Sequence, residues 1–342
     1  MNRQLPLLLC FVICFAVRLC AQQTSGYIIR NYDPKLYEGF NQTWCAVQDR
    51  SGVMYFGGGS EIIVYNGQDW SKIFVRAGVA IRALQYDSVN NTIYVGAVGE
   101  FGKLVKNSKG KYQYESLSEK LPETWRSFGD VWSVNLWNNA VVFHTSERIY
   151  FFRNGNFEVV KPVRNTFALA FRAGKRLFVR ERQLGLMEVT GTMLQLLPGG
   201  EQFADEPILS IIPWEKDKNI ILTGNHGIYV MNAGANGFES KPITDDYLLN
   251  AGVLGAKWIN DTTICIYSRS GVAFYNKQLQ LLEILDKNDG IIDESVANVF
   301  VDREHNLWLT TNYGITRVGY SMPDRYLGTN SGLEGTINYV NR

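Results

Sequence analysis

The chain has 342 residues, of which 20% are charged and 13% are aromatic, and its formal net charge is +1. This near-neutral balance gives no electrostatic reason to expect binding to nucleic acid or to an anionic membrane surface. The three histidines show neither HxH nor HxxxH spacing and have no neighbouring cysteine partners. We therefore expect no metal site and no cofactor.

The first 21 residues predict a signal peptide that is removed. Arg3 supplies a short positive start, and the stretch from Leu5 to Val17 is almost entirely apolar but too short to cross a bilayer as a helix. We expect cleavage after Ala21 and a periplasmic location, and a lipoprotein anchored at Cys20 is the alternative. No later stretch is apolar for 18 residues or more, so the sequence predicts no second membrane anchor.

Removal of the leader changes the formal charge from +1 to −1, because Arg3 and Arg18 leave with it. Three of the five cysteines leave as well. Cys45 and Cys265 remain, each within an apolar stretch in a distant part of the chain. We expect them to be buried free thiols and not a disulfide.

A repeat occurs seven times after the leader. Its centre is an aromatic or β-branched triplet between two turns, and successive centres lie 36 to 48 residues apart. The centres are Tyr55, Tyr94, Val142, Phe178, Ile221, Cys265 and Trp308. This period is typical of one propeller blade. The sequence therefore predicts an all-β fold, a seven-bladed β-propeller of four-stranded antiparallel blades, over residues 22–323.

The first blade shows the pattern in detail. We expect an inner strand over Trp44–Asp49, a second strand over Val53–Phe56 and a third over Ile62–Tyr65. Asn66-Gly67 follows the third strand and predicts a type I′ turn with two positive φ angles. The last blade repeats this order over residues 296–318.

Ring closure has two possible solutions in the sequence. A propeller must pair its first and last blades to avoid an exposed strand edge. Either Tyr27–Tyr32 or the stretch from Tyr320 to Leu327 could supply the outer strand of the seventh blade. Residues 324–342 are accordingly either a closing strand or the start of a further blade.

Several motifs resemble the two-component regulator propeller repeat. They are Asn41–Asp49 followed by Gly52–Gly57, and Val299–Asp302 followed by Asn306–Thr311 and Tyr313–Arg317. Each combines an Asp, a Gly or Asn turn and an aromatic-containing strand. The stretch Ile93–Gly102, which contains GEFG, resembles the sub-branch in which a triple-tyrosine module follows the propeller. The resemblance covers nearly the whole chain after the leader.

The resemblance implies an extracytoplasmic sensor domain of a bacterial two-component or transcriptional regulator. For this chain we expect binding of an oligosaccharide or a similar polar ligand without catalysis, and a homodimer is a further expectation. A kinase-like His box, a nucleotide lid and a basic recognition helix are missing from the sequence. The stretch from Tyr326 to Val340 resembles the entry into another blade, which favours an N-terminal part of a longer protein. The alternatives are a free-standing protein-binding scaffold and a propeller glycosidase or lyase.

Enzymatic motifs are weak in this sequence. The Asp49–Gly52 and Asp302–His305 turns resemble sialidase turns only loosely, and we interpret these aspartates as residues that terminate strands. Glu100 is the one carboxylate that we keep as a candidate ligand-binding residue, because Gly99 and Gly102 on either side would allow a ligand to approach closely. A structural role in a hairpin is the competing interpretation.

Aromatic and polar residues at the starts of the inner strands are the remaining candidates. Trp44 and Trp132 could stack on the apolar C–H face of a sugar, while Arg82, Arg126 and Asn298 could bind its hydroxyl groups. The competing interpretation is that the aromatic side chains fill the space between blades. Strand parity does not decide between them, since a slip of one residue turns each side chain to the other face.

Overall fold

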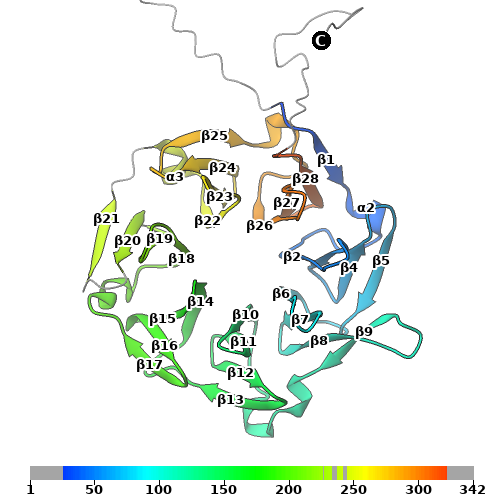
Figure 1. Ribbon diagram of the computed structural model, residues 1–342, viewed down its shortest axis with the longest axis horizontal. Coiled ribbons are helices and arrows are strands. Elements are labelled where there is room, and N and C mark those ends of the chain that lie inside the picture. Colours follow the sequence, from blue (N-terminus) through cyan, green and yellow to red (C-terminus); the bar gives the residue numbers. More distant parts are fainter. Residues whose placement is uncertain (1–25, 226, 233–236, 242–244, 322–342) are drawn as a thin grey trace, which may run out of the picture.

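The computed structural model describes residues 26–321, except for 226, 233–236 and 242–244. These residues form seven four-stranded antiparallel sheets arranged as a ring around one axis (Figure 1). The predicted all-β, seven-bladed propeller is confirmed. The predicted signal peptide and the tail over 324–342 lie outside the described residues.

The first four blades follow one another along the chain. Blade 1 contains β2 (Cys45–Gln48), β3 (Met54–Gly57), β4 (Glu61–Tyr65) and β5 (Trp70–Phe74). Blade 2 contains β6 (Ile81–Asp87), β7 (Thr92–Ala97), β8 (Glu100–Lys106) and β9 (Tyr112–Ser116). Blade 3 contains β10 (Val131–Trp137), β11 (Ala140–Thr145), β12 (Ile149–Arg153) and β13 (Asn156–Val160). Blade 4 contains β14 (Phe167–Ala173), β15 (Arg176–Glu181), β16 (Gly185–Thr190) and β17 (Met193–Leu196).

The remaining three blades complete the ring. Blade 5 contains β18 (Ile208–Pro213), β19 (Lys218–Thr223), β20 (Ile228–Asn232) and β21 (Phe238–Lys241). Blade 6 contains β22 (Val253–Trp258), β23 (Thr263–Ser268), β24 (Gly271–Asn276) and β25 (Leu281–Leu285). Blade 7 contains β26 (Val296–Val301), β27 (Leu307–Thr311), β28 (Ile315–Val318) and, from the other end of the chain, β1 (Ile29–Tyr32).

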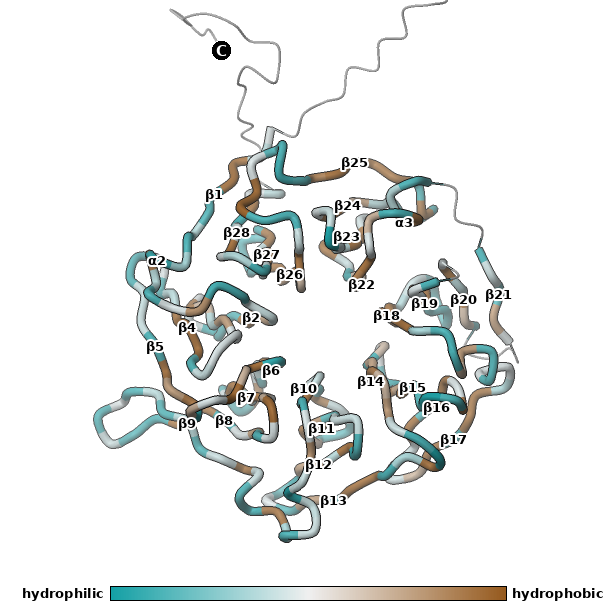
Figure 2. The backbone as a smooth tube through the Cα atoms, turned by 180° about the vertical axis from the view of Figure 1, so that it is seen from behind, coloured by the Kyte–Doolittle hydropathy of each residue, from teal (hydrophilic) through white to brown (hydrophobic). Residues whose placement is uncertain are grey.

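Helical segments are short and lie between strands. The α-helices are α2 (Pro34–Tyr37) and α3 (Asp246–Asn250), and the 3₁₀ turns are η1 (Ser118–Lys120), η2 (Glu123–Trp125), η3 (Gly200–Phe203) and η4 (Lys287–Asp289). Figure 2 shows the opposite face, where a hydrophilic hairpin between β8 and β9 projects from the ring. Within the described ranges, every helix is too short and too polar to span a membrane.

The repeat detected in the sequence is the second strand of each blade. Each of the seven repeat centres lies on that strand, for example Tyr55 on β3, Val142 on β11 and Trp308 on β27. Every residue of these three strands is buried. A strand with a neighbouring blade on each face buries its side chains on both sides, so it carries a continuous apolar run and not an alternating one.

The N-terminal strand closes the ring. β1 pairs antiparallel with β28, with Ile29 opposite Val318 and Tyr32 opposite Ile315. Of the two solutions that the sequence left open, the structure therefore uses the first. Closure joins strands that are almost 290 residues apart in the sequence, and it gives blade 7 the outer fourth strand that every other blade has.

An aromatic cluster between blades 7 and 1 supports this closure. Tyr32 stacks on Trp308, with ring centroids 5.7 Å apart, and contacts Tyr65 at 5.4 Å and Trp70 at 5.2 Å. The side chains of Tyr32 and Trp308 are each only 3% exposed. Packed aromatic pairs add stability beyond the area that they bury, so this cluster is a main contact between the two ends of the ring.

The Asp residues of the repeat end the inner strands, as predicted. Asp302 Oδ1 accepts the backbone N–H of Asn306, and its Oδ2 accepts the indole N–H of Trp308 at 2.8 Å. Asp49 in blade 1 accepts two backbone N–H groups of its turn and the Tyr55 hydroxyl. An Asp at this position therefore ties a tight turn to an aromatic residue on the next strand.

One predicted turn is wrong. Asn66 does not have a positive φ angle, whereas Gly67 has φ of 101°. The side chain of Asn66 instead accepts the backbone N–H groups of Gln68 and Asp69, which makes a longer Asx-type turn. The prediction for the cysteines is confirmed, since Cys45 and Cys265 are buried and unpaired with each other.

Candidate ligand-binding site

Six of the seven innermost strands, all except β2, carry a bulge near their starts. In β6, Ile81 lies opposite Ala97 and Ala83 opposite Gly96, so Arg82 is the extra residue. The same shift makes Trp132 the extra residue in β10. β14, β18, β22 and β26 have equivalent shifts, which involve Ala168 and Leu169, Leu209, Leu254 and Ala297 respectively. A bulge turns its side chain out of the regular alternation, and all of these residues remain partly exposed.

The first three blades bring their inner-strand residues into contact. Trp44, which directly precedes β2, lies beneath the guanidinium of Arg82, whose Cζ is 4.4 Å from the indole centroid. The same Cζ lies 5.7 Å from the ring of Trp132. Arg82 Nε donates to Asp130 Oδ1 at 2.6 Å. We call Trp44, Arg82, Asp130 and Trp132 the tryptophan–arginine cluster.

The tryptophan–arginine cluster combines an apolar surface with polar groups. Trp132 is 39% exposed, and the side chains of Arg82 and Asp130 are 20% and 25% exposed. A cation between two aromatic rings is held in place by attraction to their faces. The cluster is therefore an ordered surface that remains accessible to solvent on blades 1 to 3.

Three of the six residues named from the sequence come together in this cluster, namely Trp44, Arg82 and Trp132. The other three lie elsewhere, namely Arg126, Glu100 and Asn298. Arg126 donates from Nε to the Leu121 carbonyl and from Nη2 to the Glu119 carbonyl, both at 2.8 Å. It therefore stabilises the connection between blades 2 and 3, which also contains Asp130 at its end.

Glu100 is a buried carboxylate that is fully engaged. It is 1% exposed and accepts hydrogen bonds from the hydroxyl groups of Tyr114, Ser116 and Ser118, and it pairs with Arg76 at 2.9 Å. Burial and the nearby Glu100 carboxylate raise the pKa of Tyr114, so this tyrosine stays a hydrogen-bond donor. This arrangement organises the outer part of blade 2.

Asn298 lies on β26 and belongs to a different contact. Its Oδ1 accepts from Lys257 Nζ at 2.7 Å, and Lys257 also donates to the Val299 carbonyl at 2.9 Å. The ammonium group is desolvated between blades 6 and 7, which lowers the pKa of Lys257 to about 8. Asn298 thus holds a lysine of the neighbouring blade.

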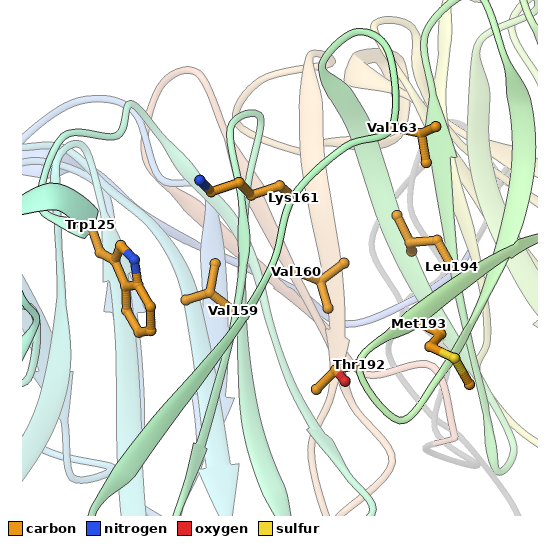
Figure 3. Close-up of a pocket in the computed structure, with 8 residues that line it drawn as sticks. All are labelled: Trp125, Val159, Val160, Lys161, Val163, Thr192, Met193 and Leu194. Atoms are coloured by element: carbon orange, nitrogen blue, oxygen red, sulfur yellow. The ribbon is translucent and has the colours of Figure 1, made fainter.

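A surface hollow lies on the outer rim. It has a volume of about 650 Å³ and lies open between the outer strands of blades 3 and 4. Figure 3 shows the side chains that line it. Its lining residues are Trp125, Val159, Val160, Lys161, Val163, Thr192, Met193 and Leu194. Val163 is 61% exposed and Met193 is 68% exposed. Apart from Lys161 and Thr192, the side chains that line the hollow are apolar or aromatic.

Asp130 and Lys257 take part in these contacts but were not among the candidates named from the sequence. Asp130 lies 48 residues after Arg82, and no local pattern connects the two. Lys257 occupies an otherwise apolar strand, which is the only signal that could have drawn attention to it. Across the described ranges, no group of three or more His, Cys, Asp or Glu side chains is arranged to hold a metal ion.

Comparisons by sequence identify no relative. No family model matches the chain, and no curated protein matches it. Structural neighbours are numerous. The extracellular domain of the protein described as hybrid two-component system BT4673 from B. thetaiotaomicron has a TM-score of 0.67 at 17% identity, and the match covers 85% of this chain and 39% of that one. The corresponding domain of BT3049 from the same organism has a TM-score of 0.62 at 16% identity, with 85% and 42% covered.

Other propellers are similar to the same degree. A streptogramin B lyase has a TM-score of 0.64 at 12% identity, and the match covers 85% of this chain and 97% of the lyase. At such identities the likeness shows the β-propeller fold. Extracellular domains of Bacteroides two-component systems are among the neighbours, as the repeat motifs predicted. The chain spans about two fifths of the length of those domains.

Proposed function

We propose that this chain is the ligand-sensing propeller of a bacterial two-component or transcriptional regulator and that it acts outside the cytoplasm. In this proposal it binds an oligosaccharide or a similar polar ligand at the tryptophan–arginine cluster and does not catalyse a reaction. The observation that carries the proposal is the position of Arg82 between Trp44 and Trp132. Exposed indole faces with a hydrogen-bonding arginine beside them suit the apolar and hydroxyl surfaces of a sugar.

The position of the tryptophan–arginine cluster suggests how ligand binding could change the arrangement of the blades. Arg82 of blade 2 contacts residues of blades 1 and 3, so a ligand that displaces or orders this side chain acts on three blades together. A ligand shifts a conformational equilibrium only as far as it binds the two states differently. We propose that such a shift changes blade or dimer geometry and that a signalling module reads the change.

A non-catalytic role is supported by the hydrogen bonds and ion pairs that the candidate carboxylates already make. Glycoside cleavage by the usual route needs two carboxyl groups that face one substrate. Glu100 is buried and holds five donors, so it is committed to structure. Asp130 is the one carboxylate of the tryptophan–arginine cluster, and it pairs with Arg82.

Ligand binding can be tested by calorimetry with two matched tryptophan variants. A glycan array identifies a ligand first, and isothermal titration then compares the wild type with Trp132→Ala and Trp125→Ala. We expect Trp132→Ala to weaken binding at least tenfold, because stacking on an exposed indole is lost. Trp125→Ala removes an indole from the rim hollow and should bind like the wild type. If Trp125→Ala weakens binding and Trp132→Ala does not, the ligand binds in the rim hollow and not at the tryptophan–arginine cluster.

Export is tested separately from ligand binding. Expression with the native leader in a bacterial host, followed by mass spectrometry of the periplasmic fraction, should give a mature protein that starts at Gln22. An acylated N-terminus at Cys20 would instead support the lipoprotein alternative, and an uncleaved cytoplasmic chain would contradict the proposed location.

A protein-binding scaffold is the second candidate function. The rim hollow favours it, because Val163, in the connection after β13, and Met193, on β17, both line the hollow and expose apolar side chains. A homodimer through this surface should dissociate on Met193→Lys, and sedimentation velocity measures the change. A wild type that stays monomeric at high concentration would count against the dimer.

A further inference from the structure

The polar side of the tryptophan–arginine cluster offers donors and an acceptor next to each other. Arg82 uses Nε to bind Asp130 Oδ1, and within the described part of the chain its two Nη groups make no hydrogen bond. Asp130 Oδ2 likewise accepts no hydrogen bond from these residues. Two N–H donor groups and a carboxylate oxygen are therefore available on one edge of the site.

Adjacent hydroxyl groups of a sugar match this arrangement. Each hydroxyl can donate one hydrogen bond and accept others, so one hydroxyl can donate to Asp130 while its neighbour accepts from Arg82. Hydrogen bonds to charged partners are shorter and stronger than those between neutral groups. The Arg82–Asp130 pair can make both contacts and keep its own ion pair.

The aromatic side fixes how such a sugar would lie. Trp132 is 39% exposed and the indole of Trp44 is partly exposed on the other side of Arg82. A pyranose ring has an apolar C–H face that packs on an indole while its hydroxyl groups point along the ring edge. The same sugar can therefore stack on Trp132 and reach Arg82 and Asp130 with its edge.

The charges near the cluster disfavour an acidic ligand. Arg82 is the only charged residue among the bulge residues, and Asp130 neutralises it. A carboxylate or sulfate that approaches Arg82 also approaches Asp130, whose charge repels it. Lys257 is a further cation of the inner strands, but it lies on blade 6 and its ammonium binds Asn298 and the Val299 carbonyl.

We propose that the tryptophan–arginine cluster selects a neutral pyranose residue through two adjacent hydroxyl groups, which Arg82 and Asp130 bind together while the sugar face stacks on Trp132. This inference rests on the proposed function and narrows its ligand to neutral glycans. Uronic acids and sulfated sugars are excluded from the site by the Asp130 carboxylate.

The proposal is tested by whether Asp130→Asn lowers or raises the affinity for the ligand. The folded wild type and Asp130→Asn are applied to an array of neutral glycans (β-glucans, xylans, mannans, arabinans) and acidic glycans (pectins, alginates, glycosaminoglycans). The oligosaccharide with the strongest signal is then titrated by calorimetry. For a neutral ligand, Asp130→Asn should lower the affinity about tenfold, since a charged acceptor is lost. For an acidic ligand the same change should raise the affinity, since a repulsive charge is removed.

A control variant and salt complete the test. Asp205 is exposed in the connection between blades 4 and 5, so Asp205→Asn makes the same charge change away from the cluster and should leave affinity unchanged. Affinity for a neutral glycan should also be the same at low and high sodium chloride. Binding of an acidic glycan that strengthens in Asp130→Asn overturns this inference but leaves the proposed function intact. A wild type that binds no glycan on the array overturns both.

Discussion

We expect His144 to make the stability of this propeller sensitive to mild acid. The residue lies on β11 in blade 3, is 0% exposed, and neither ring nitrogen has a hydrogen-bond partner among the described residues. It pairs across the strands with Ser133, and its ring lies 6.2 Å from that of Phe167 at the boundary with blade 4. Burial lowers the pKa of His144 from 6.5 to about 3.

The magnitude follows from the difference between the two pKa values. In the unfolded chain the imidazole binds a proton below pH 6.5, whereas in the folded protein it stays neutral down to about pH 3. The contribution of His144 to stability is thus complete above pH 6.5 and falls as the pH is lowered towards 3. Between pH 7.5 and pH 5.0, protonation of the unfolded state lowers the free energy of unfolding by about 2 kcal/mol.

Urea unfolding at the two pH values measures this term. The wild type is compared with His144→Phe, which keeps an aromatic ring and cannot bind a proton. Other titrating groups act equally in both proteins, so the difference between their pH effects isolates His144. We expect the variant to lose about 2 kcal/mol less than the wild type on going to pH 5.0.

His305→Asn is the matched control. His305 is exposed in the turn after β26 with φ of 60°, a conformation that Asn tolerates, so this variant removes an exposed imidazole without straining the backbone. If the wild type and His144→Phe show the same pH dependence within about 0.5 kcal/mol, His144 is not held neutral by burial and the reasoning is wrong.

Three further predictions concern the framework. Glu100→Ala should lower the free energy of unfolding by about 3 kcal/mol, because several buried donors lose their acceptor. The affinity for a glycan ligand should stay unchanged in calorimetry. A loss of affinity without a loss of stability would make Glu100 a ligand contact. Asp302→Ala should lower the free energy of unfolding by about 2–3 kcal/mol, since the Trp308 indole and the Asn306 amide lose their partner, and an unchanged urea midpoint would contradict the role of this turn. Tyr32→Ala should lower the free energy of unfolding by about 3–5 kcal/mol, because it removes the centre of the aromatic cluster at the ring closure. Phe74 is 58% exposed, so Phe74→Ala should lower it by less than about 1 kcal/mol. Equal effects of the two variants in thermal unfolding would show that the aromatic cluster does not stabilise the closure.

The candidate site was only partly predictable. Trp44, Arg82 and Trp132 could be named because they stand at the expected starts of three inner strands. Asp130 could not, since its pairing with Arg82 joins two blades and depends on the path of the connection between them. The bulges were also invisible in the sequence, and they decide that Arg82 and Trp132 stay accessible when their neighbours Ile81 and Val131 are buried.

The sequence by itself determined the number of blades and the position of their second strands. Those strands are packed on both faces, so they need continuous apolar runs, and their turns need Asp, Gly and Asn at fixed places. These are local requirements that one stretch of chain records. Ring closure is different, because Tyr27–Tyr32 and Tyr320–Leu327 are both β-prone and only one of them can lie beside β28. The tertiary structure decided for β1, since closing the ring depends on the distance between the first and last blades, which no local pattern contains.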